Sequence, residues 1–236
     1  MTKSSLLAAS ILALLCSPIL AAGIVHAPAQ PPVSPVLITH LDRSRRIVAL
    51  TFDACQTRKP TGYDSQIIAI LESTHTPATL MLGGRWMETH PAATEALGRD
   101  PLFEIGNHSY LHPHMTKISE ARMEQELLET QDDQQRYTGR QGHLFRPPYG
   151  EYNPQLLQTA ARLGLRSMTW EVVSGDPDPH VTAKDMIREI LRRTRPGSII
   201  IMHMNGRGWH TAEALPAVIA GLRKKGYTFV RVSDGI

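Results

Sequence analysis

Short apolar runs alternate with amphipathic stretches along the chain from residue 45 onward. Several runs are rich in Val, Ile, Leu or aromatic residues over a few positions, which is typical of buried strands. We expect strands at Ile47–Phe52, Ala78–Leu82, Phe103–Gly106, His143–Phe145, Leu165–Trp170, Ser198–Met202 and Tyr227–Val232. Between them we expect helices at Asp64–Ser73, Pro91–Leu97, Lys117–Tyr137, Pro154–Leu163, Ala183–Arg193 and Thr211–Lys224.

This alternation predicts a single α/β domain over residues 45–236. Strands that alternate with helices run parallel and are joined by crossovers. The domain is long enough for a distorted or incomplete (β/α) barrel, and a doubly wound open sheet is the alternative. The longest expected helix, Lys117–Tyr137, is mostly polar, with Ile118, Ala121 and Leu128 along one side, so we expect it on the outside.

The N-terminus has the pattern of an export signal. Lys3 gives a positive start, an apolar stretch follows, and Ala21-Ala22 is a small-residue cleavage end. We therefore predict a signal peptide at residues 1–22 and an exported protein that is periplasmic or secreted. Residues 23–44 hold four prolines and no periodic apolar pattern, which predicts a mostly irregular lead-in.

Composition excludes several classes of protein. The chain has 236 residues, of which 42% are hydrophobic and 20% charged, as in ordinary globular proteins. Its net charge is +3 and its longest basic run is Arg223-Lys224-Lys225, so we expect no nucleic-acid partner. No apolar stretch after the signal approaches 18 residues, so we expect no stable membrane span.

Candidate chemistry gathers at the carboxyl ends of the expected strands, where parallel α/β folds build their sites. The residues there are Asp53, His108 with His112, Arg146, Trp170 with Asp176, and His203. Any one of them also has an ordinary explanation, such as a turn cap for Asp53, a core histidine for His203 or a surface ion pair for Arg146. Their joint placement favours a site.

The spacing of His108 and His112 favours a shared metal ion, although two surface histidines would give the same pattern. Imidazole ligands favour Zn²⁺ or another divalent transition metal. Such a metal acidifies a water and polarises a carbonyl, and the reaction then needs a proton acceptor and a proton donor. Asp53 suits the first role and His203 the second. Arg146, if it lies beside Asp53, would favour the ionised base.

The ordered set of motifs resembles the NodB-homology polysaccharide deacetylases, carbohydrate esterase family 4. The resemblance spans about residues 46–232 and rests on Thr51-Phe52-Asp53, Asn107-His108-Ser109-x-x-His112, Arg146-Pro147-Pro148-Tyr149-Gly150, Trp170 with Asp176, and Ile201-Met202-His203. It implies a distorted (β/α) barrel and metal-dependent removal of acetyl groups from N-acetylated sugar polymers.

The resemblance also implies a role for each residue of the site. Asp53 would be the general base, His108 and His112 metal ligands, and His203 the general acid. Arg146 would hold the base and Asp176 would orient His203. The Tyr149 backbone N–H would help to stabilise the oxyanion.

One departure from the family pattern bears on the metal. The family usually has a second Asp, the third metal ligand, directly after the base, and here that position is Ala54. We predict that Asp64 replaces it, because a loop that leaves the end of the same strand can fold back; a helix cap is the alternative role for Asp64. Lesser candidates are Cys55, which is otherwise a small buried side chain, His114, and a bound water beside Asp53.

We therefore expect a metal-dependent hydrolase that acts on an N-acetylated, peptidoglycan- or chitin-like polysaccharide. The alternatives are a catalytically impaired glycan-binding relative, which Ala54 favours, and a metal-dependent hydrolase of another amide or ester. A pure binding protein has no need of the full acid–base set, which favours the enzyme. Aromatic residues at expected loop positions could hold sugar rings or simply pack, and the candidates are Trp86, Tyr110, Tyr149, Trp170 and Trp209.

Overall fold

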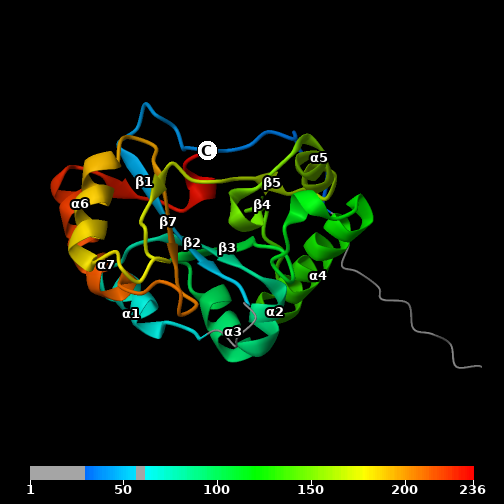
Figure 1. Ribbon diagram of the computed structural model, residues 1–236, viewed down its shortest axis with the longest axis horizontal. Coiled ribbons are helices and arrows are strands. Elements are labelled where there is room, and N and C mark those ends of the chain that lie inside the picture. Colours follow the sequence, from blue (N-terminus) through cyan, green and yellow to red (C-terminus); the bar gives the residue numbers. More distant parts are fainter. Residues whose placement is uncertain (1–29, 57–61) are drawn as a thin grey trace, which may run out of the picture.

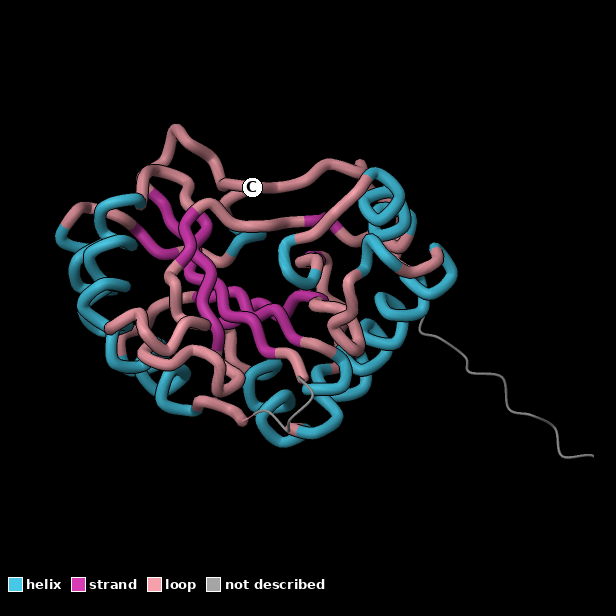
Figure 2. The backbone as a smooth tube through the Cα atoms, in the orientation of Figure 1, coloured by secondary structure: helices cyan, strands magenta, loops and turns pink. Residues whose placement is uncertain are grey.

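Parallel strands form the centre of the molecule and helices surround them (Figures 1 and 2). The computed structural model describes residues 30–56 and 62–236, so the predicted signal at residues 1–22 lies outside the described residues. The strands are β1 (Ile47–Ala54), β2 (Ala78–Leu82), β3 (Phe103–Asn107), β4 (Leu144–Phe145), β5 (Arg166–Ser167), β6 (Val172–Val173), β7 (Ile199–His203) and β8 (Thr228–Phe229).

The sheet is curled but not closed. Its order is β5-β4-β3-β2-β1-β7-β6, every pair is parallel, and β8 adds to the start of β1. The end strands β5 and β6 do not pair within the described chain, so the predicted incomplete (β/α) barrel is confirmed. β1 lies between β2 and β7, and its register sets Asp53 level with Met81 on one side and His203 on the other.

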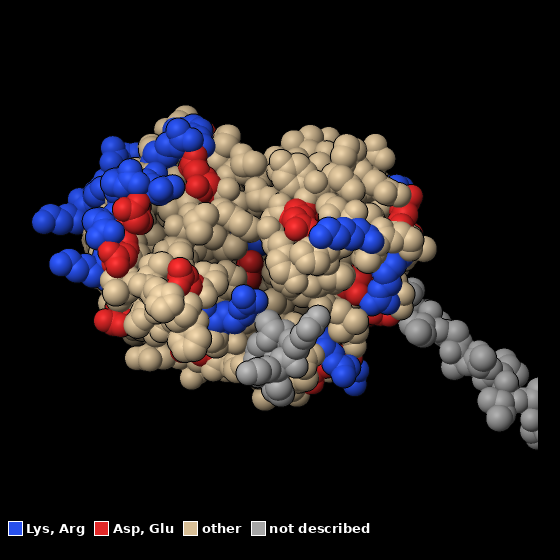
Figure 3. Space-filling model, in the orientation of Figure 1, with Lys and Arg blue, Asp and Glu red and all other residues tan. Residues whose placement is uncertain are grey.

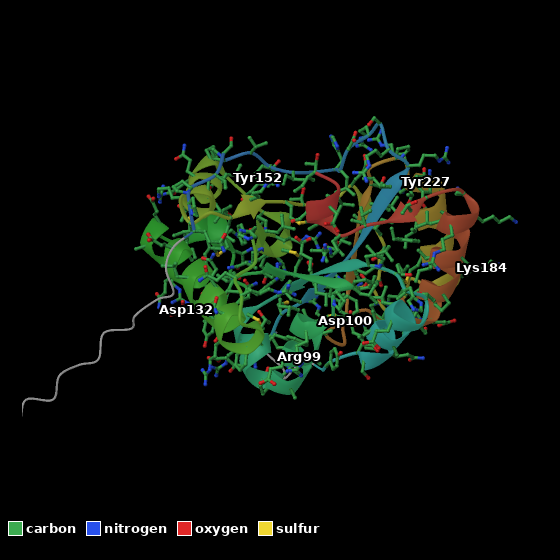
Figure 4. The ribbon with its side chains drawn as sticks, turned by 180° about the vertical axis from the view of Figure 1, so that it is seen from behind. Arg99, Asp100, Asp132, Tyr152, Lys184 and Tyr227 are labelled. Carbon is green, nitrogen blue, oxygen red and sulfur yellow. The ribbon has the colours of Figure 1, made fainter. Side chains whose placement is uncertain are left out.

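The helices lie outside the sheet. They are α1 (Ser65–Ser73), α2 (Gly84–Thr89), α3 (Pro91–Arg99), α4 (Glu120–Thr138), α5 (Pro154–Arg162), α6 (Ala183–Arg193) and α7 (Thr211–Lys224). In Figure 4 the labelled Asp132 on α4 and Lys184 on α6 lie at opposite edges of the molecule. In the part of the chain that the structure describes, no helix combines the length and the apolar character needed to cross a bilayer.

Alternation along β1 separates two layers of the core. Leu50, Phe52 and Ala54 join the large apolar cluster between the sheet and the helices. Ala49 instead packs with Met81 in a second cluster on the inner face of the sheet. Because successive side chains of a strand point to opposite faces, Asp53 shares the inner face with Ala49. The polar end of β1 therefore opens into the barrel.

Helix α4 differs from its predicted packing. Of the residues expected to face inward, Ala121 is exposed. The buried face is largely polar and consists of Met123, Glu126, Leu127, Thr130, Gln131, Asp133 and Gln134. Apolar periodicity missed this face because its polar side chains serve neighbouring segments, as when the Gln134 side chain accepts a hydrogen bond from the Gly142 N–H. The short elements α2 and β6 were also not predicted.

The lead-in is extended along the domain rather than separate from it. We call residues 30–44 the N-terminal segment; Figure 1 shows it as the blue trace that passes the C-terminus. Ile38 pairs with Met168 beyond β5, and His40 pairs with Ser198 just before β7. Leu41 is buried in the inner cluster. The N-terminal segment thus joins the two sides of the open barrel.

Candidate active site

The predicted acid–base residues and two of the three predicted metal ligands, His108 and His112, meet in one cavity at the carboxyl ends of the strands. Its volume is about 250 Å³, and its lining includes Asp53, Cys55, His108, His112, Tyr149, Asp176, His203 and Arg207. Figure 3 shows that this face is hollowed between the side built from α6 and α7 and the side built from α4 and α5. Arg146 lies directly beneath, fully buried.

Asp53 is held by Arg146. One guanidinium nitrogen donates to Asp53 Oδ1 at 2.5 Å, and the other donates to Thr51 Oγ1 at 2.7 Å. Burial by itself would raise the pKa of Asp53, but the charge of Arg146 and the nearby imidazoles outweigh it and lower the pKa. Asp53 is therefore kept ionised, as a proton acceptor must be. Asp53 is therefore not a turn cap, and the ion pair of Arg146 is buried rather than on the surface.

His203 is held by Asp176. His203 Nδ1 lies 3.0 Å from Asp176 Oδ1, and the His203 backbone N–H donates to Oδ2 at 2.6 Å. Burial lowers the pKa of His203, but Asp176 and then Asp53 outweigh it and raise the pKa above the ordinary value. His203 can therefore carry a proton near neutral pH and present Nε2 to the cavity.

Two hydroxyl groups that sequence reasoning missed fix Asp176 in turn. Ser174 Oγ donates to Asp176 Oδ1 and Thr211 Oγ1 donates to Oδ2, each at 2.8 Å. With these bonds both oxygens of the buried carboxylate are saturated. Only the distance of two residues between Ser174 and Asp176 could have suggested such a contact, because Thr211 comes from α7.

His108 and His112 lie side by side, with ring centroids 4.9 Å apart. The Arg146 carbonyl oxygen accepts a hydrogen bond from His108 Nδ1 at 2.8 Å, so Nε2 is the ring nitrogen that can bind a metal. Burial lowers the pKa of both imidazoles, that of His112 to about 3. Neutral imidazoles are the form that binds metal.

The loop that carries these histidines is tied to α4. The Asn107 amide donates to the Leu127 carbonyl at 2.9 Å, and the Leu111 N–H donates to Glu126 Oε2 at 2.7 Å. Glu126 is buried and also accepts a bond from Arg122. The polar face of α4 thus positions the loop that carries His108 and His112, a role that sequence reasoning did not assign to it.

Strained backbone marks the same loop. Among the described residues, four that are not glycine have a positive φ; two of them, His112 and Tyr149, line the cavity, and Ser109 directly follows His108. Such conformations cost on the order of 1–3 kcal/mol each and persist where the surroundings enforce them. At Tyr149 (φ 59°, ψ 4°) the N–H has no hydrogen-bond acceptor within the described chain. It is available to a ligand.

The structure supports the capping role for Asp64 rather than the ligand role. Its carboxylate accepts a hydrogen bond from the Gln66 N–H at 3.2 Å, at the start of α1. Asp64 does not line the cavity. The physical reason is local: a helix begins with unsatisfied N–H groups, and a side-chain oxygen just before it satisfies one of them.

Cys55 lies beside the two histidines that the sequence predicts as metal ligands. The sulfur of Cys55 and one ring nitrogen each of His108 and His112 lie within 4.8 Å of one another. The thiol is buried, and burial raises its pKa to about 12. Three donor atoms of these types, gathered at the floor of an open cavity, suit a borderline divalent ion with a position left for substrate.

The aromatic candidates divide into packing and exposed residues. Trp86 is buried and donates to the Gly62 carbonyl, and Tyr110 bonds Glu88. Trp170 lies over Arg146, with the guanidinium carbon 5.6 Å from the ring centroid. Tyr149 and Trp209 are more than half exposed. These last two are the faces available to a sugar ring.

Known proteins are similar to this chain in sequence and in fold. A family model described as polysaccharide deacetylase matches residues 40–168. The chain is 28% identical over 192 residues to the peptidoglycan-N-acetylmuramic acid deacetylase PdaA of Bacillus subtilis. The aligned stretch covers 80% of this chain and 71% of that protein.

Two solved structures bear on what the arrangement does. A peptidoglycan N-acetylglucosamine deacetylase superimposes with a TM-score of 0.79 and 27% identity, over 85% of this chain and 92% of that one. A CE4 family pseudoenzyme from Bacillus anthracis superimposes with a TM-score of 0.77 and 26% identity, over 86% and 69%. Similar folds thus include both an enzyme and a pseudoenzyme.

Proposed function

Because the chain belongs to the polysaccharide deacetylase family, we propose that it removes N-acetyl groups from a peptidoglycan- or chitin-like polymer with the help of a divalent transition metal such as Zn²⁺. The observation that carries this proposal is the pairing of Arg146-held Asp53 with Asp176-held His203 in the cavity that also contains His108 and His112. An ionised base and a protonated acid face one small space.

The proposed chemistry divides among these residues. A divalent ion held by His108 and His112 would polarise the acetyl carbonyl and acidify a water. Asp53 takes the proton of the attacking water as general base. The Tyr149 N–H donates to the oxyanion that forms at the former carbonyl. His203 then protonates the leaving amine, and Asp176 keeps its imidazole oriented and charged. Arg146 keeps Asp53 ionised throughout.

A direct assay tests the proposal. Purified protein is incubated with N-acetylated chitooligosaccharides and with peptidoglycan, and released acetate is measured. We expect release that stops with a chelator and returns with added Zn²⁺. His203→Ala, which retains Asp53 and the two metal-binding histidines, is the matched control and should release little acetate.

The likeness to a CE4 pseudoenzyme and the presence of Ala54 keep a second candidate, a glycan-binding protein without activity. That protein would bind the polymer in a pull-down assay and release no acetate with any metal. Acetate release from small amides or esters, but from no polymer, would favour the remaining candidate, a metal-dependent hydrolase of another amide or ester.

We also propose that the protein is exported. The support is Lys3, the apolar stretch after it and Ala21-Ala22, together with a relative named for its action on peptidoglycan. Intact-mass measurement of protein from the native envelope fraction should give a mature N-terminus near Gly23. Retention of Met1 would contradict export.

A further inference from the structure

We infer that Cys55 is the third protein ligand of the metal, so that Cys55, His108 and His112 hold the ion together. The inference rests on the proposed function for the presence of a metal, whereas the choice of ligand rests on the positions of this chain's own residues.

The end of β1 explains why Cys55, and not residue 54, faces the metal site. Ala54 is fully buried in the apolar cluster between the sheet and the helices. Cys55 follows it, and with the two-residue alternation of an extended chain it returns to the inner face that carries Asp53. Cys55 and Asp53 both line the cavity, and Ala54 does not. In this backbone the donor lost at position 54 is supplied one residue later.

The donor atoms are close to what a metal requires. Around a tetrahedral zinc, bond lengths of about 2.3 Å to sulfur and 2.0–2.1 Å to nitrogen put the donors roughly 3.3–3.6 Å apart. Here they lie within 4.8 Å of one another. Side-chain rotations that move the donor atoms by about 1 Å would bring them to the spacing of a tetrahedral zinc site. His108 is already oriented by the Arg146 carbonyl, so the adjustment falls to His112 and Cys55.

A buried amide supports Cys55 from behind. Asn205 Nδ2 lies 2.7 Å from the Cys55 carbonyl oxygen and 3.6 Å from its sulfur. Asn205 is itself buried, and it follows β7 only two residues after His203. An N–H that reaches the sulfur would stabilise a metal-bound thiolate, as outer hydrogen bonds commonly do for metal ligands. The cationic Arg207 lines the same cavity and favours negative charge there.

The competing ligands are engaged elsewhere. The Asp64 carboxylate caps α1. His114 pairs with Glu151 at 2.9 Å, and its ring stacks on Tyr149. Asp53 Oδ2 lies 3.5 Å from His108 Nε2, but its other oxygen is bound to Arg146. A metal bound by Asp53 in place of Cys55 would also leave the reaction without its base.

A thiolate in the site changes which ions it selects. Sulfur and imidazole donors favour Zn²⁺ and Co²⁺, whereas carboxylate donors also suit Mg²⁺, Ca²⁺ and Mn²⁺. We therefore expect this protein to bind Zn²⁺ and Co²⁺ and to discriminate against Mg²⁺ and Ca²⁺.

Cobalt spectroscopy tests the assignment without relying on activity. The full chain, reduced and freed of metal, is titrated with Co²⁺. We expect one equivalent to bind and to give a thiolate-to-cobalt charge-transfer absorption in the near ultraviolet. Cys55→Ser should lack this absorption and bind Co²⁺ and Zn²⁺ at least about 10-fold more weakly, since even outer-shell changes cost 10–100-fold. Cys55→Asp should also lack the absorption but still bind one ion, because a carboxylate can replace the thiolate.

Matched controls separate Cys55 from other thiols and carboxylates. Cys16 is the other cysteine of the full chain and lies in the predicted signal peptide. Cys16→Ser and Asp64→Ala should both retain the absorption and the affinity. A wild-type protein that binds one Co²⁺ without the absorption would overturn the inference, as would unchanged affinity in Cys55→Ser.

The outcome for the proposed function is separate. Acetate release by a cobalt-loaded protein without the absorption would remove Cys55 as a ligand and leave the deacetylase proposal standing. The absorption without acetate release from any polymer would confirm the ligand and argue against the deacetylase.

Discussion

The two sides of the cavity are built differently. On the acid–base side, Asp53 and His203 are level on the neighbouring strands β1 and β7, and each is fixed by a buried partner. On the metal side, His108 and His112 follow β3 on a loop with two positive φ values, which Glu126 and Asn107 tie to α4.

The difference shows where a relative of known enzymes can change. Residues on paired strands are fixed by register, so their replacement leaves buried charges without partners. A loop can supply a donor from a different position, as Cys55 does just beyond the end of β1. We expect changes on the acid–base side to remove turnover and changes on the metal side to alter which ion binds.

The largest effect should come from the acid and the base. Asp53→Asn and His203→Ala should each lower turnover by about 10²–10⁴-fold, the usual contribution of general acid–base catalysis. Metal content should not change, because neither residue is a proposed ligand. Acetate release and metal analysis on the same samples measure both quantities. Near wild-type turnover in either metal-loaded variant would show that its assigned role is wrong.

The partner of the acid should set the alkaline limit of activity. His203 must be protonated to act, so activity falls as pH rises through its pKa, which Asp176 raises. Asp176→Asn removes a negative charge, which should move the alkaline limb of kcat/KM to lower pH by about 1–3 units. Thr211→Val removes one hydrogen bond to Asp176 but leaves its charge, so the limb should move much less than in Asp176→Asn. If the alkaline limb does not move in Asp176→Asn, a group other than His203 sets it.

A third change concerns Glu171, which supports the start of β7, the strand that carries His203. Glu171 binds Arg43 of the N-terminal segment and also Arg195 and Ser198, just before β7. Burial raises the pKa of Glu171, but these hydrogen bonds outweigh it and lower the pKa to about 2. A lowered pKa stabilises the fold above the unfolded value, about 4.3, and this stability is lost as pH falls toward 2.

Glu171→Gln should therefore lower the free energy of unfolding at neutral pH by about 1–3 kcal/mol, the usual contribution of hydrogen bonds to a charged group. The free energy of unfolding of the variant should also depend less steeply on pH between about 4.3 and 2 than that of the wild type. Urea unfolding at several pH values measures both effects. Equal pH dependence in the two proteins would contradict this account.

The smallest effect should come from Asp64. Asp64→Ala removes the cap of α1 and should lower the free energy of unfolding by about 1 kcal/mol. Asp64→Asn, which keeps a capping oxygen, should be nearly neutral. Metal content should be unchanged in both, since the metal side is built from Cys55 and the loop. Loss of zinc in Asp64→Ala with a stable fold would return Asp64 to the ligand set.

What sequence could predict follows the same division. The expected strands Ala78–Leu82 and Phe103–Gly106 and the expected helices Ala183–Arg193 and Thr211–Lys224 match the structure to within a residue, because their apolar residues serve the core. Short elements such as β6 carry too few residues for a period. The packing face of α4 was not predicted because its polar residues bond loops distant in sequence.

The site shows the same limit. Strand-end placement brought Asp53 and His203 together correctly, since parallel register is a regular feature. The sequence could not decide between Asp64 and Cys55 as the third metal ligand. The answer depends on the path of the chain after β1 and on the face of the sheet that Ala54 occupies, and neither follows from a repeating pattern of apolar residues. Ser174 and Thr211 act through side-chain contacts that come from separate elements.

The N-terminal segment has a consequence for the order of events during folding. Its residues precede β1 in the chain, yet the Leu41 N–H donates to the Gly197 carbonyl and the Asp42 N–H donates to the Gly235 carbonyl, more than 150 residues later. Contacts so distant in sequence form late, after the local elements between them. The open side of the barrel is therefore joined last, and until Ile199 and Val232 are in place the apolar side chain of Leu41 lacks part of its packing.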